Sequence, residues 1–340
     1  MRIGFTYDLR DDYLNQGYTE EQTAEFDALE TIEALHETIE SLGHNVERIG
    51  NVKSLANMLN SGKRWDLVFN IAEGMYGTGR EAQVPALLDA YDIPYTFSSP
   101  LVMTVTMDKA MAKRIVRDVG VPTTPFSVIA AEEDIKRVKL SYPLFLKPIA
   151  EGTGKGVAAA SRVTTPQELH NYSLELLARY NQPVLVEPFL PGREFTVGIL
   201  GEGRHAKVIG VLEVRLRSNA ESWCHSYFNK EHCEDVIDYV LVDDQEARHA
   251  AEVALQAWNA LGCVDGGRID IRCDRFGLPF FLEANPLSGL RPGHSDLVIL
   301  AEQAGVNYKE LIGDIINHAC RRYHLNSVFK HADAELESIV

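Results

Sequence analysis

Carboxylate, amide and arginine side chains lie in two short predicted strands on either side of residue 275. The run 268–274 alternates polar with apolar side chains, which is the period of a strand with one buried face. The run 280–285 is typical of a second strand, and turn residues lie between the two. The sequence therefore predicts a hairpin centred between Phe276 and Gly277.

In that register Asp270 lies opposite Glu283 and Arg268 lies opposite Asn285, so that all four side chains share one face. Two carboxylates and an amide held this close repel one another or stay unsatisfied unless a hard cation binds between them. Oxygen ligands of this kind suit magnesium that carries substrate phosphates. The alternative is the solvated face of an edge hairpin, on which Arg268 and Asp270 form a surface ion pair of little energetic value.

The first 100 residues predict a parallel sheet with crossover helices. Strands are expected at 2–7, 44–49 and 65–71, and apolar residues at helical spacing predict a helix over 26–42. The loop 73–80 follows the third strand at its carboxyl end, where open α/β sheets bind ligands. A flexible connector would be equally rich in glycine, and this alternative stays open.

The residues after 100 predict a second unit built around a glycine-rich loop. We expect a helix over 108–119 and an extended linker over 121–125, then a strand over 142–147, the loop 151–156 and a strand of small residues from Val157. This is not the strand–loop–helix context of a Walker phosphate loop or a dinucleotide fingerprint. Backbone amides of such a loop can still cradle a triphosphate.

The remaining chain contains the hairpin and a closing helix over 308–323. With 340 residues, 45% of them hydrophobic and 24% charged, the chain is long enough for two or three compact units. We predict an α/β (α+β) fold with units at 1–100, 101–183 and 184–340.

Charge and hydropathy exclude several classes of function. The formal net charge of −16 argues against a general nucleic-acid surface, because neutralising phosphates needs clustered Lys and Arg. No apolar run is long enough to span a membrane, and the N-terminus lacks the order of segments found in signal peptides. Five scattered cysteines fit a reducing compartment rather than a disulfide framework. We expect a cytoplasmic protein that binds a small polyanion, with no nucleic-acid or membrane partner.

Four potential zinc ligands flank residues 226–231 in mirror order: Cys224, His225, His232 and Cys233. Two adjacent ligands at each end make tetrahedral closure awkward, and the spacing fits no common zinc pattern. Ordinary loop residues are the default interpretation, and a zinc site is the alternative.

Several motifs occur in an order that is more specific than any one of them. They are Met107-Asp-Lys109, Pro143-Leu-Phe-Leu-Lys-Pro148, Glu151-Gly-Thr-Gly-Lys-Gly156, Leu185-Val-Glu-Pro-Phe-Leu-Pro-Gly-Arg-Glu-Phe-Thr-Val-Gly198, Arg268-Ile-Asp-Ile-Arg272 and Leu282-Glu-Ala-Asn-Pro286. Over residues 60–320 this set resembles the ATP-grasp superfamily and, within it, the D-alanine–D-alanine ligase family. The resemblance implies an ATP-grasp fold in which the second and third units clamp ATP between two sheets.

The resemblance also assigns a nucleotide site, residue by residue. Lys109 and Lys147 match family lysines that contact ATP phosphates, and Glu194 matches the carboxylate that binds the ribose hydroxyls. The other ATP residues are the lid residues Gly152, Thr153 and Gly154, the adenine-reading hinge at Glu187, Phe189 and Leu190, and Leu282. The alternative for Glu187 is an exposed charge at a strand end, and for each lysine it is a surface position.

The resemblance gives the hairpin its role as well. Asp270, Glu283 and Asn285 match ligands of magnesium, with two ions expected and manganese as an alternative, and Arg268 lies beside the transferred phosphate. The catalytic set is completed by Lys230, which resembles a loop lysine that closes over the phosphate, and by Gly289, which matches a backbone amide that faces the developing oxyanion. Small residues near 289 can also simply make a turn.

The implied chemistry is activation of a carboxylate by the γ-phosphate of ATP, followed by attack of an amine on the acyl phosphate. Positioning and preorganised charge would carry the catalysis, and the closed lid would keep water from the acyl phosphate. The implied partners are a small carboxylate and an amine, amino acids foremost, and the family suggests a homodimer.

The substrate loops depart from the family pattern. The first loop, 7–15, offers no match for the family glutamate that holds the first amino acid. Glu73-Gly74 replaces a family His-Gly, and the segment 77–80 replaces an acidic one. We therefore expect an acceptor other than D-alanine.

Three residues of these divergent segments are assigned to the substrate site: Glu73, Arg80 and Arg291. The alternative for Arg80 is a structural ion pair with Glu81 or Asp89. The leading hypothesis for the function is an ATP-dependent carboxylate–amine ligase acting on amino acids or similar small molecules. Two others stay open, a true D-alanine–D-alanine ligase of peptidoglycan precursor synthesis and a catalytically silent ATP-binding regulatory protein.

Overall fold

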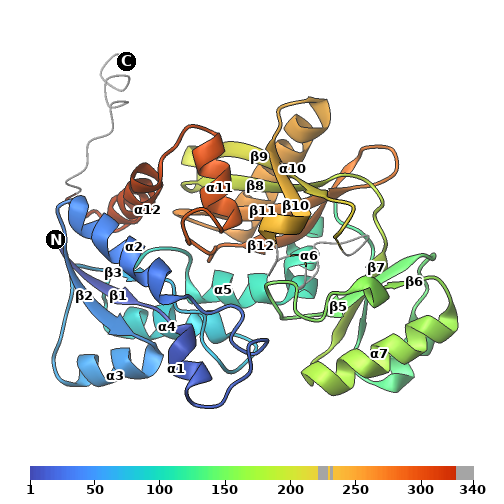
Figure 1. The fold of residues 1–340 in the computed structure, drawn as a ribbon, viewed down its shortest axis with the longest axis horizontal. Coiled ribbons are helices and arrows are strands. Elements are labelled where there is room, and N and C mark those ends of the chain that lie inside the picture. Colours follow the sequence, from blue (N-terminus) through green and yellow to red (C-terminus); the bar gives the residue numbers. More distant parts are fainter. Residues whose placement is uncertain (221–228, 230–232, 327–340) are drawn as a thin grey trace.

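The computed structural model describes residues 1–220, 229 and 233–326, whose strands form three sheets (Figure 1). The strands are β1 (Arg2–Thr6), β2 (Asn45–Gly50), β3 (Leu67–Asn70), β4 (Ser127–Ile129), β5 (Leu144–Pro148), β6 (Arg162–Val163), β7 (Val184–Pro188), β8 (Glu194–Leu200), β9 (Lys207–Leu216), β10 (Ile237–Leu241), β11 (Gly266–Cys273) and β12 (Pro279–Asn285). The helices are α1 (Arg10–Leu14), α2 (Leu29–Ser41), α3 (Val52–Asn60), α4 (Gln83–Ala90), α5 (Pro100–Met107), α6 (Lys109–Asp118), α7 (Pro166–Tyr180), α9 (Cys233–Val236), α10 (Gln245–Leu261), α11 (Asp296–Gln303) and α12 (Tyr308–Arg322). Among these described helices, none has both the length and the apolar character that crossing a bilayer requires.

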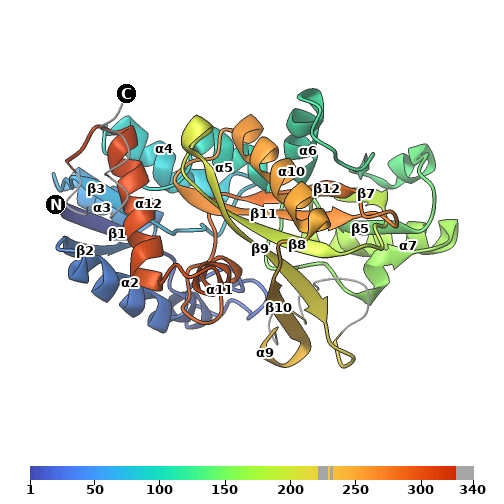
Figure 2. The same cartoon turned by 90° about the horizontal axis from the view of Figure 1, so that it is seen from above.

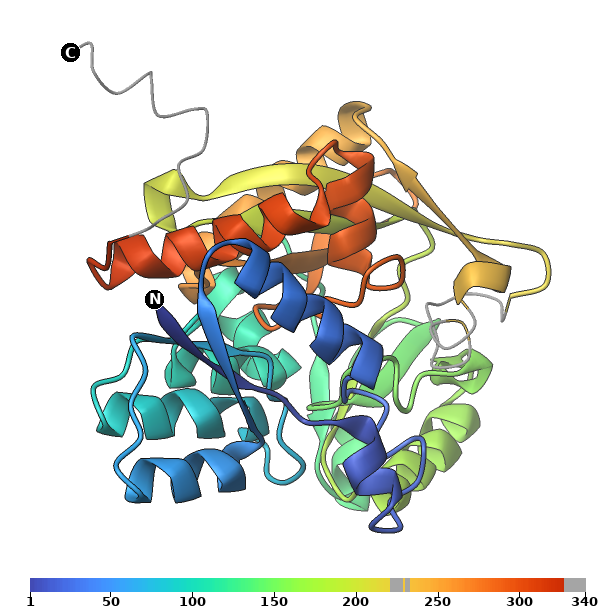
Figure 3. The ribbon, with the colours of Figure 1, turned by 60° about the vertical axis from the view of Figure 1, so that its left-hand side comes forward.

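The first sheet, β2-β1-β3, is parallel, as the alternation of strands and helices predicts. Helix α2 begins at Leu29 rather than at residue 26, so the acidic residues just before it belong to a loop. Helix α12 packs against α2, and its apolar residues join the core formed by Ile3 and Phe5 of β1. Both ends of the described chain therefore meet at this sheet (Figure 3).

The second sheet, β4-β7-β5-β6, is antiparallel and is covered by α7, whose Leu169 and Leu176 pack against Leu144 and Val186. The predicted strand from Val157 is wrong. The backbone N–H of Ala158 donates to the Ser161 side chain, and the chain makes a 3₁₀ turn over Ala159–Ser161 before β6 begins.

The third sheet, β10-β9-β8-β11-β12, is antiparallel and has a helix on each face. Helix α10 lies along one face, where Trp258 packs with Phe195 and Ile269 (Figure 2). Helix α11 packs against the other face, where an added Cβ at Gly198 would lie only 2.8 Å from Leu300. Because alternate residues of a strand face opposite sides, the polar residues of β11 point away from α10.

The β11–β12 hairpin has the predicted register at its functional end. Arg268 pairs with Asn285 and Asp270 pairs with Glu283. A bulge then shifts the register, and the turn half is displaced by one residue, with Ile271 opposite Phe281. The bulge leaves Leu282 without a partner on β11, so that Leu282 and Glu283 line the same cleft although they are adjacent.

Tertiary packing crosses the predicted boundaries at residues 100 and 183. Helices α5 and α6 pack against β12 and α10, and the linker runs beside β12, where the N–H of Phe281 donates to the carbonyl of Pro122 at 2.8 Å. Strand β7 belongs to the second sheet. We retain three units, one for each sheet, as a proposal.

Candidate functional site

The predicted metal face forms as a cluster of polar side chains on the hairpin. The carboxylate of Asp270 accepts hydrogen bonds from Arg268 at 2.6 and 2.7 Å, from Thr196 at 3.0 Å and from the Asn285 amide at 3.1 Å. Glu283 lies directly opposite on β12. The hairpin does lie at the edge of its sheet, because β12 is the last strand. The alternative of a solvated polar face is wrong, because Asp270 is only 8% exposed.

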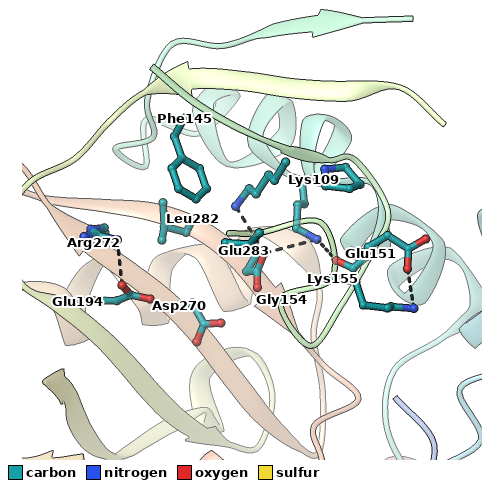
Figure 4. A pocket seen from close by; sticks show the side chains of 13 residues that line it. Lys109, Phe145, Glu151, Gly154, Lys155, Glu194, Asp270, Arg272, Leu282 and Glu283 are labelled. Carbon is teal, nitrogen blue, oxygen red and sulfur yellow. Dashed lines mark hydrogen bonds and ion pairs between the residues drawn. The ribbon is translucent and has the colours of Figure 1, made fainter. Parts of the chain in front are cut away.

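Two predicted phosphate lysines reach this face from separate elements. Lys109 begins α6 and its Nζ lies 3.4 Å from the Glu283 carboxylate, while Lys147 on β5 lies 3.6 Å from it (Figure 4). Both lysines are buried, so the surface alternative is wrong for each. Cationic groups from α6 and from the second sheet therefore converge on the acidic hairpin of the third.

Glu187 is buried rather than exposed at a strand end. Its carboxylate lies 2.8 Å from Lys113 and 3.7 Å from Lys147, and it accepts a hydrogen bond from Thr124 at 2.6 Å. Burial acts to raise the pKa of Glu187, but the two lysines outweigh it and lower that pKa to about 2. The side chain is thus ionised and holds Lys147 toward the cleft.

An apolar recess lies beside the lysines and is lined by Phe145, Phe189, Leu190 and Leu282, together with Glu187. Its rim is formed by Arg272, whose guanidinium lies 5.1 Å from the centroid of the Phe189 ring. Arg272 also holds the Glu194 carboxylate at 3.0 Å (Figure 4). A flat apolar slot that ends in polar groups is suited to a nucleobase and its ribose.

The glycine-rich loop covers the other end of the cleft. Thr153 and Gly154 have positive φ, and the N–H of Gly152 donates to Glu25 at 2.7 Å. A Cβ at Gly152 would lie 2.4 Å from that carboxylate, so only glycine permits the approach. Lys155 lies 2.6 Å from Glu151 and 3.2 Å from Glu25, which ties the loop to the first unit.

Arg80 has a different partner from either one predicted. It is buried, its Nη2 donates to both carboxylate oxygens of Glu25 at 2.8 and 3.0 Å, and its Nη1 donates to the carbonyl of Ala150 at 3.0 Å. Pairing with Glu81 or Asp89 was the expected structural alternative, and neither forms an ion pair with it. Burial acts to raise the pKa of Glu25, yet Arg80 and Lys155 lower it to about 2.

A cavity of about 220 Å³ opens on the far side of Asn285 and Arg268. It contains two of the predicted substrate residues, Glu73 and Arg291, and the predicted oxyanion residue Gly289. It also contains residues that sequence reasoning missed, chiefly Glu25, Asp27, Thr31, Glu81, His294 and Asp296. We name this space the acceptor cavity. We name the pocket lined by Lys109, Lys147, Glu194, Asp270 and Glu283 the nucleotide cleft.

Other missed residues are cations that hold predicted residues in place: the buried Lys113 and Lys155 and the half-buried Arg272. Their sequence signal is weak, because each is a single charge within an ordinary helix, loop or strand. Glu25 and Asp27 had a usable signal, since they lie between β1 and α2 at the carboxyl edge of a parallel sheet, where ligands bind. Lys230, Cys224, His225 and His232 lie outside the described residues, as does the side chain of Cys233.

The donor set fits a hard divalent cation only jointly with phosphate oxygens. Within the described residues, no group of three or more His, Cys, Asp or Glu side chains is placed to hold a metal ion. The hairpin offers two carboxylates and one amide, Asp270, Glu283 and Asn285, which leaves coordination sites for a polyphosphate.

Comparisons with known proteins agree with this geometry. A family model described as D-ala D-ala ligase C-terminus matches residues 115–317, more than half of the chain. A D-alanine–D-alanine ligase of Bordetella petrii is 32% identical over 277 residues, which are 80% of this chain and 81% of that protein. The uncharacterized protein y4sG of Sinorhizobium fredii is 33% identical over 265 residues, 77% of each.

Solved structures show the same fold. A D-alanine–D-alanine ligase from Bacillus anthracis complexed with ATP superposes with a TM-score of 0.71 over 95% of this chain and 99% of that one, at 22% identity. The VanG D-Ala:D-Ser ligase from Enterococcus faecalis also gives 0.71, at 20% identity and 94% and 99% coverage. These results confirm the predicted α/β fold class and the predicted superfamily. The chain therefore belongs to the D-alanine–D-alanine ligase family of the ATP-grasp superfamily, and it is an ADP-forming, ATP-dependent ligase that joins a carboxylate to an amine.

Proposed function

We propose that this ligase joins two small amino acids, one of which it activates as an acyl phosphate in the space between the nucleotide cleft and the acceptor cavity. The carboxylate oxygen of the first substrate attacks the γ-phosphorus of ATP and ADP leaves. The amine of the second substrate then attacks the acyl carbon, inorganic phosphate leaves and the amine loses a proton. A cytoplasmic location is part of the proposal, and the three described cysteines, Cys263, Cys273 and Cys320, support it because they form no disulfide.

The residues of the nucleotide cleft would bind and orient ATP. The adenine fits the recess at Phe145, Phe189, Leu190 and Leu282, and the ribose hydroxyls fit Glu194. Lys109 and Lys147 would take the phosphates, exchanging their present pairing with Glu283 for contacts to phosphate oxygens. Glu187 would keep Lys147 charged and aimed, and the loop at 152–154 would exclude water.

Asp270, Glu283 and Asn285 would hold magnesium, with two ions proposed, and the metal when bound would neutralise charge on the phosphates. Arg268 lies beside these ligands and would stabilise negative charge on the transferred phosphoryl group. Gly289 lines the acceptor cavity, where its backbone amide would face the oxyanion of the tetrahedral intermediate. Lys230 and a homodimer stay predictions.

One observation carries this proposal more than any other. Lys109 and Lys147, from α6 and β5, reach within 3.4 and 3.6 Å of one carboxylate, that of Glu283, directly across from Asp270. Cations that converge on paired carboxylates at the mouth of an adenine-sized recess are suited to a metal-bound triphosphate. A silent regulatory protein would have no need for this complete set.

The test is a panel of D- and L-amino acids, given singly and in pairs with MgATP, with ADP release and the mass of the ligated product both measured. We expect ADP to form only with an accepted substrate and in equal amount to the product. Glu283→Gln should lower kcat about 10²- to 10³-fold, the usual cost of losing one charge-stabilising group. Glu30→Gln, the same chemical change at an exposed position of α2, should leave kcat unchanged.

Each other outcome points to a different function. Tight ATP binding with no product from any pair would favour the regulatory protein. Rapid turnover of D-alanine alone would favour the true D-alanine–D-alanine ligase, the activity that the relatives' names carry. Unchanged kcat in Glu283→Gln would remove the hairpin from the chemistry.

A further inference from the structure

The acceptor cavity contains three carboxyl groups that have no cationic partner within ion-pair distance among the described residues: Asp27, Glu73 and Glu81. They come from three places, the loop before α2, the loop after β3 and the 3₁₀ turn at Arg80–Ala82. All three residues are half-buried, and a carboxylate that is partly withdrawn from water is stabilised by a counter-charge or takes up a proton. The sign of the charge that is missing from the empty cavity therefore indicates which kind of chemical group it binds.

The cations close to this cluster are engaged elsewhere. Arg80 and Lys155 neutralise Glu25, and Arg268 is held by Asp270 and lies 3.6 Å from Asp296. Arg10, Arg291 and His294 also line the cavity, but none of them lies within ion-pair distance of the three carboxyl groups. Among the described residues no cation is left to pair with these three carboxyl groups, so the cavity is suited to a ligand that brings positive charge.

The pKa values of the three carboxyl groups agree with a cavity that lacks positive charge. Burial and the charge of Asp8 raise the pKa of Asp27 to about 7, and burial raises the pKa of Glu81 to about 7 despite the charge of Arg80. Burial, Glu81 and Glu25 together raise the pKa of Glu73 well above its ordinary value. Mutual repulsion of this kind is removed when a cation binds among the carboxylates.

A second, independent observation points to a polar ligand in the same place. The hydroxyl of Thr31 lines the cavity on α2, the residue is 1% exposed, and no described group forms a hydrogen bond with that hydroxyl. Buried hydroxyls are almost always satisfied, so an unsatisfied one at a cavity wall marks a place for a ligand donor or acceptor. An ammonium group, which has three donors and no acceptor, suits one hydroxyl among carboxylates.

On the basis of the proposed ligase function, we propose that one of the two ligated substrates is a diamino acid, an amino acid whose side chain carries a second ammonium group. A neutral amino acid such as alanine brings one ammonium and one carboxylate, and so adds no net charge to the cavity. A diamino acid brings one further positive charge, which the Asp27, Glu73 and Glu81 cluster would bind. Arg291, at the exposed rim, is placed to meet the substrate carboxylate.

Matched pairs of substrates test this with the unmodified protein. Lysine is compared with norleucine and ornithine with norvaline, in D and L forms, because each pair differs only by the terminal ammonium group. We expect kcat/KM to be at least about 100-fold higher for the diamino acid, since a site built for a polar group discriminates strongly against an analogue that lacks it. Ligated product from neutral amino acids at equal or higher kcat/KM would overturn the inference and leave the proposed function standing. No product from any substrate would overturn both.

Single substitutions in the acceptor cavity test which side chains bind the second ammonium group. Glu73→Gln and Glu81→Gln should each raise the KM for lysine, leave the KM for ATP nearly unchanged and reduce the lysine-to-norleucine ratio about tenfold or more. Glu30→Gln should change none of these quantities, and melting curves establish that each variant is folded. An unchanged ratio in both folded cavity variants would overturn the assignment of these residues.

Discussion

The nucleotide cleft and the acceptor cavity lie side by side, and they treat buried charge in opposite ways. In the cleft, Asp270, Glu187 and Glu283 each lie within ion-pair distance of an arginine or a lysine. In the cavity, Glu73 and Glu81 have no such partner among the described groups. The carboxylates of the cleft are therefore paired with cations in the protein without ligands, whereas on the inference above those of the cavity gain a counter-charge only when substrate binds.

Glu25 marks the boundary between the two regions. It faces the acceptor cavity, yet Arg80 and Lys155 hold it and its carboxylate fixes the glycine loop through Gly152. Its pKa is lowered to about 2, while that of its neighbour Glu81 is raised to about 7. Carboxyl groups of one cavity can thus have very different pKa values, because charged partners as well as burial decide the pKa.

The largest expected change in stability comes from breaking the ion pair between Lys113 and Glu187, beside the nucleotide cleft. Lys113 is fully buried, lies 2.8 Å from Glu187 and donates to Thr123, Thr124 and the carbonyl of Phe281. Lys113→Met should lower the free energy of unfolding by about 3–5 kcal/mol, because the buried Glu187 loses its closer counter-charge and keeps only Lys147, at 3.7 Å. Urea denaturation measures this, with exposed Lys136→Met as the control.

The double variant Lys113→Met/Glu187→Gln sharpens that test. Removing both charges should recover a large part of the lost stability, since no unpaired ion is left behind. Additive losses in the two single variants would mean that the pair is not the unit that stabilises this region.

A smaller change in stability, and an increase rather than a loss, is expected from a substitution in the acceptor cavity. The pKa of Glu81 is raised from its ordinary 4.5 to about 7 in the folded protein, so the folded state holds a proton that the unfolded state releases between these values. Stability contributed by this proton falls as pH rises through that window. Glu81→Gln should therefore stabilise the empty protein by about 1–2 kcal/mol at pH 8. The stability advantage should fall with pH and vanish below the ordinary pKa of 4.5. Melting curves across pH check this, and a destabilised variant at pH 8 would contradict the comparison.

The smallest effect is expected at Thr31. Thr31→Val removes a buried hydroxyl that has no described partner, so the stability of the empty protein should stay the same or rise by about 0.5–1 kcal/mol. The KM for the diamino acid should rise several-fold, since one acceptor for its ammonium group is lost. A loss of stability without a change in KM would give this hydroxyl a purely structural role.

The same contrast explains how much the sequence could predict. The period-two alternation around Asp270 fixed the faces of the hairpin, and the pairing of Arg268 with Asn285 is confirmed. The half of the hairpin nearer the turn is displaced by one residue from the predicted register. The bulge between Asp270 and Ile271 causes this shift, and a bulge leaves no trace in the alternation of polar and apolar residues. Local patterns therefore predicted the part of the site that two neighbouring strands build.

The residues of the acceptor cavity are harder to predict from the sequence, because they come from loops far apart in the chain. Glu25 meets Gly152 across 127 residues, and Arg80 meets Ala150 across 70. No local period encodes such contacts, so the partners that the sequence predicts for Arg80 are wrong. Only the position of Asp27 after β1, at the carboxyl edge of a parallel sheet, indicates that it lines a site. The structure was needed to show which charges are paired and which are not.

Calorimetric titration of lysine into the protein saturated with magnesium and a non-hydrolysable ATP analogue, at pH 6.5 in two buffers of different ionisation enthalpy, tests the central claim directly. Asp27 and Glu81, whose pKa values are about 7, are largely protonated in the empty cavity at this pH. A second ammonium group should expel those protons, so lysine should release protons on binding and norleucine should release fewer. Equal proton release for the two ligands, or net uptake with lysine, would contradict the claim that the cavity awaits a cation.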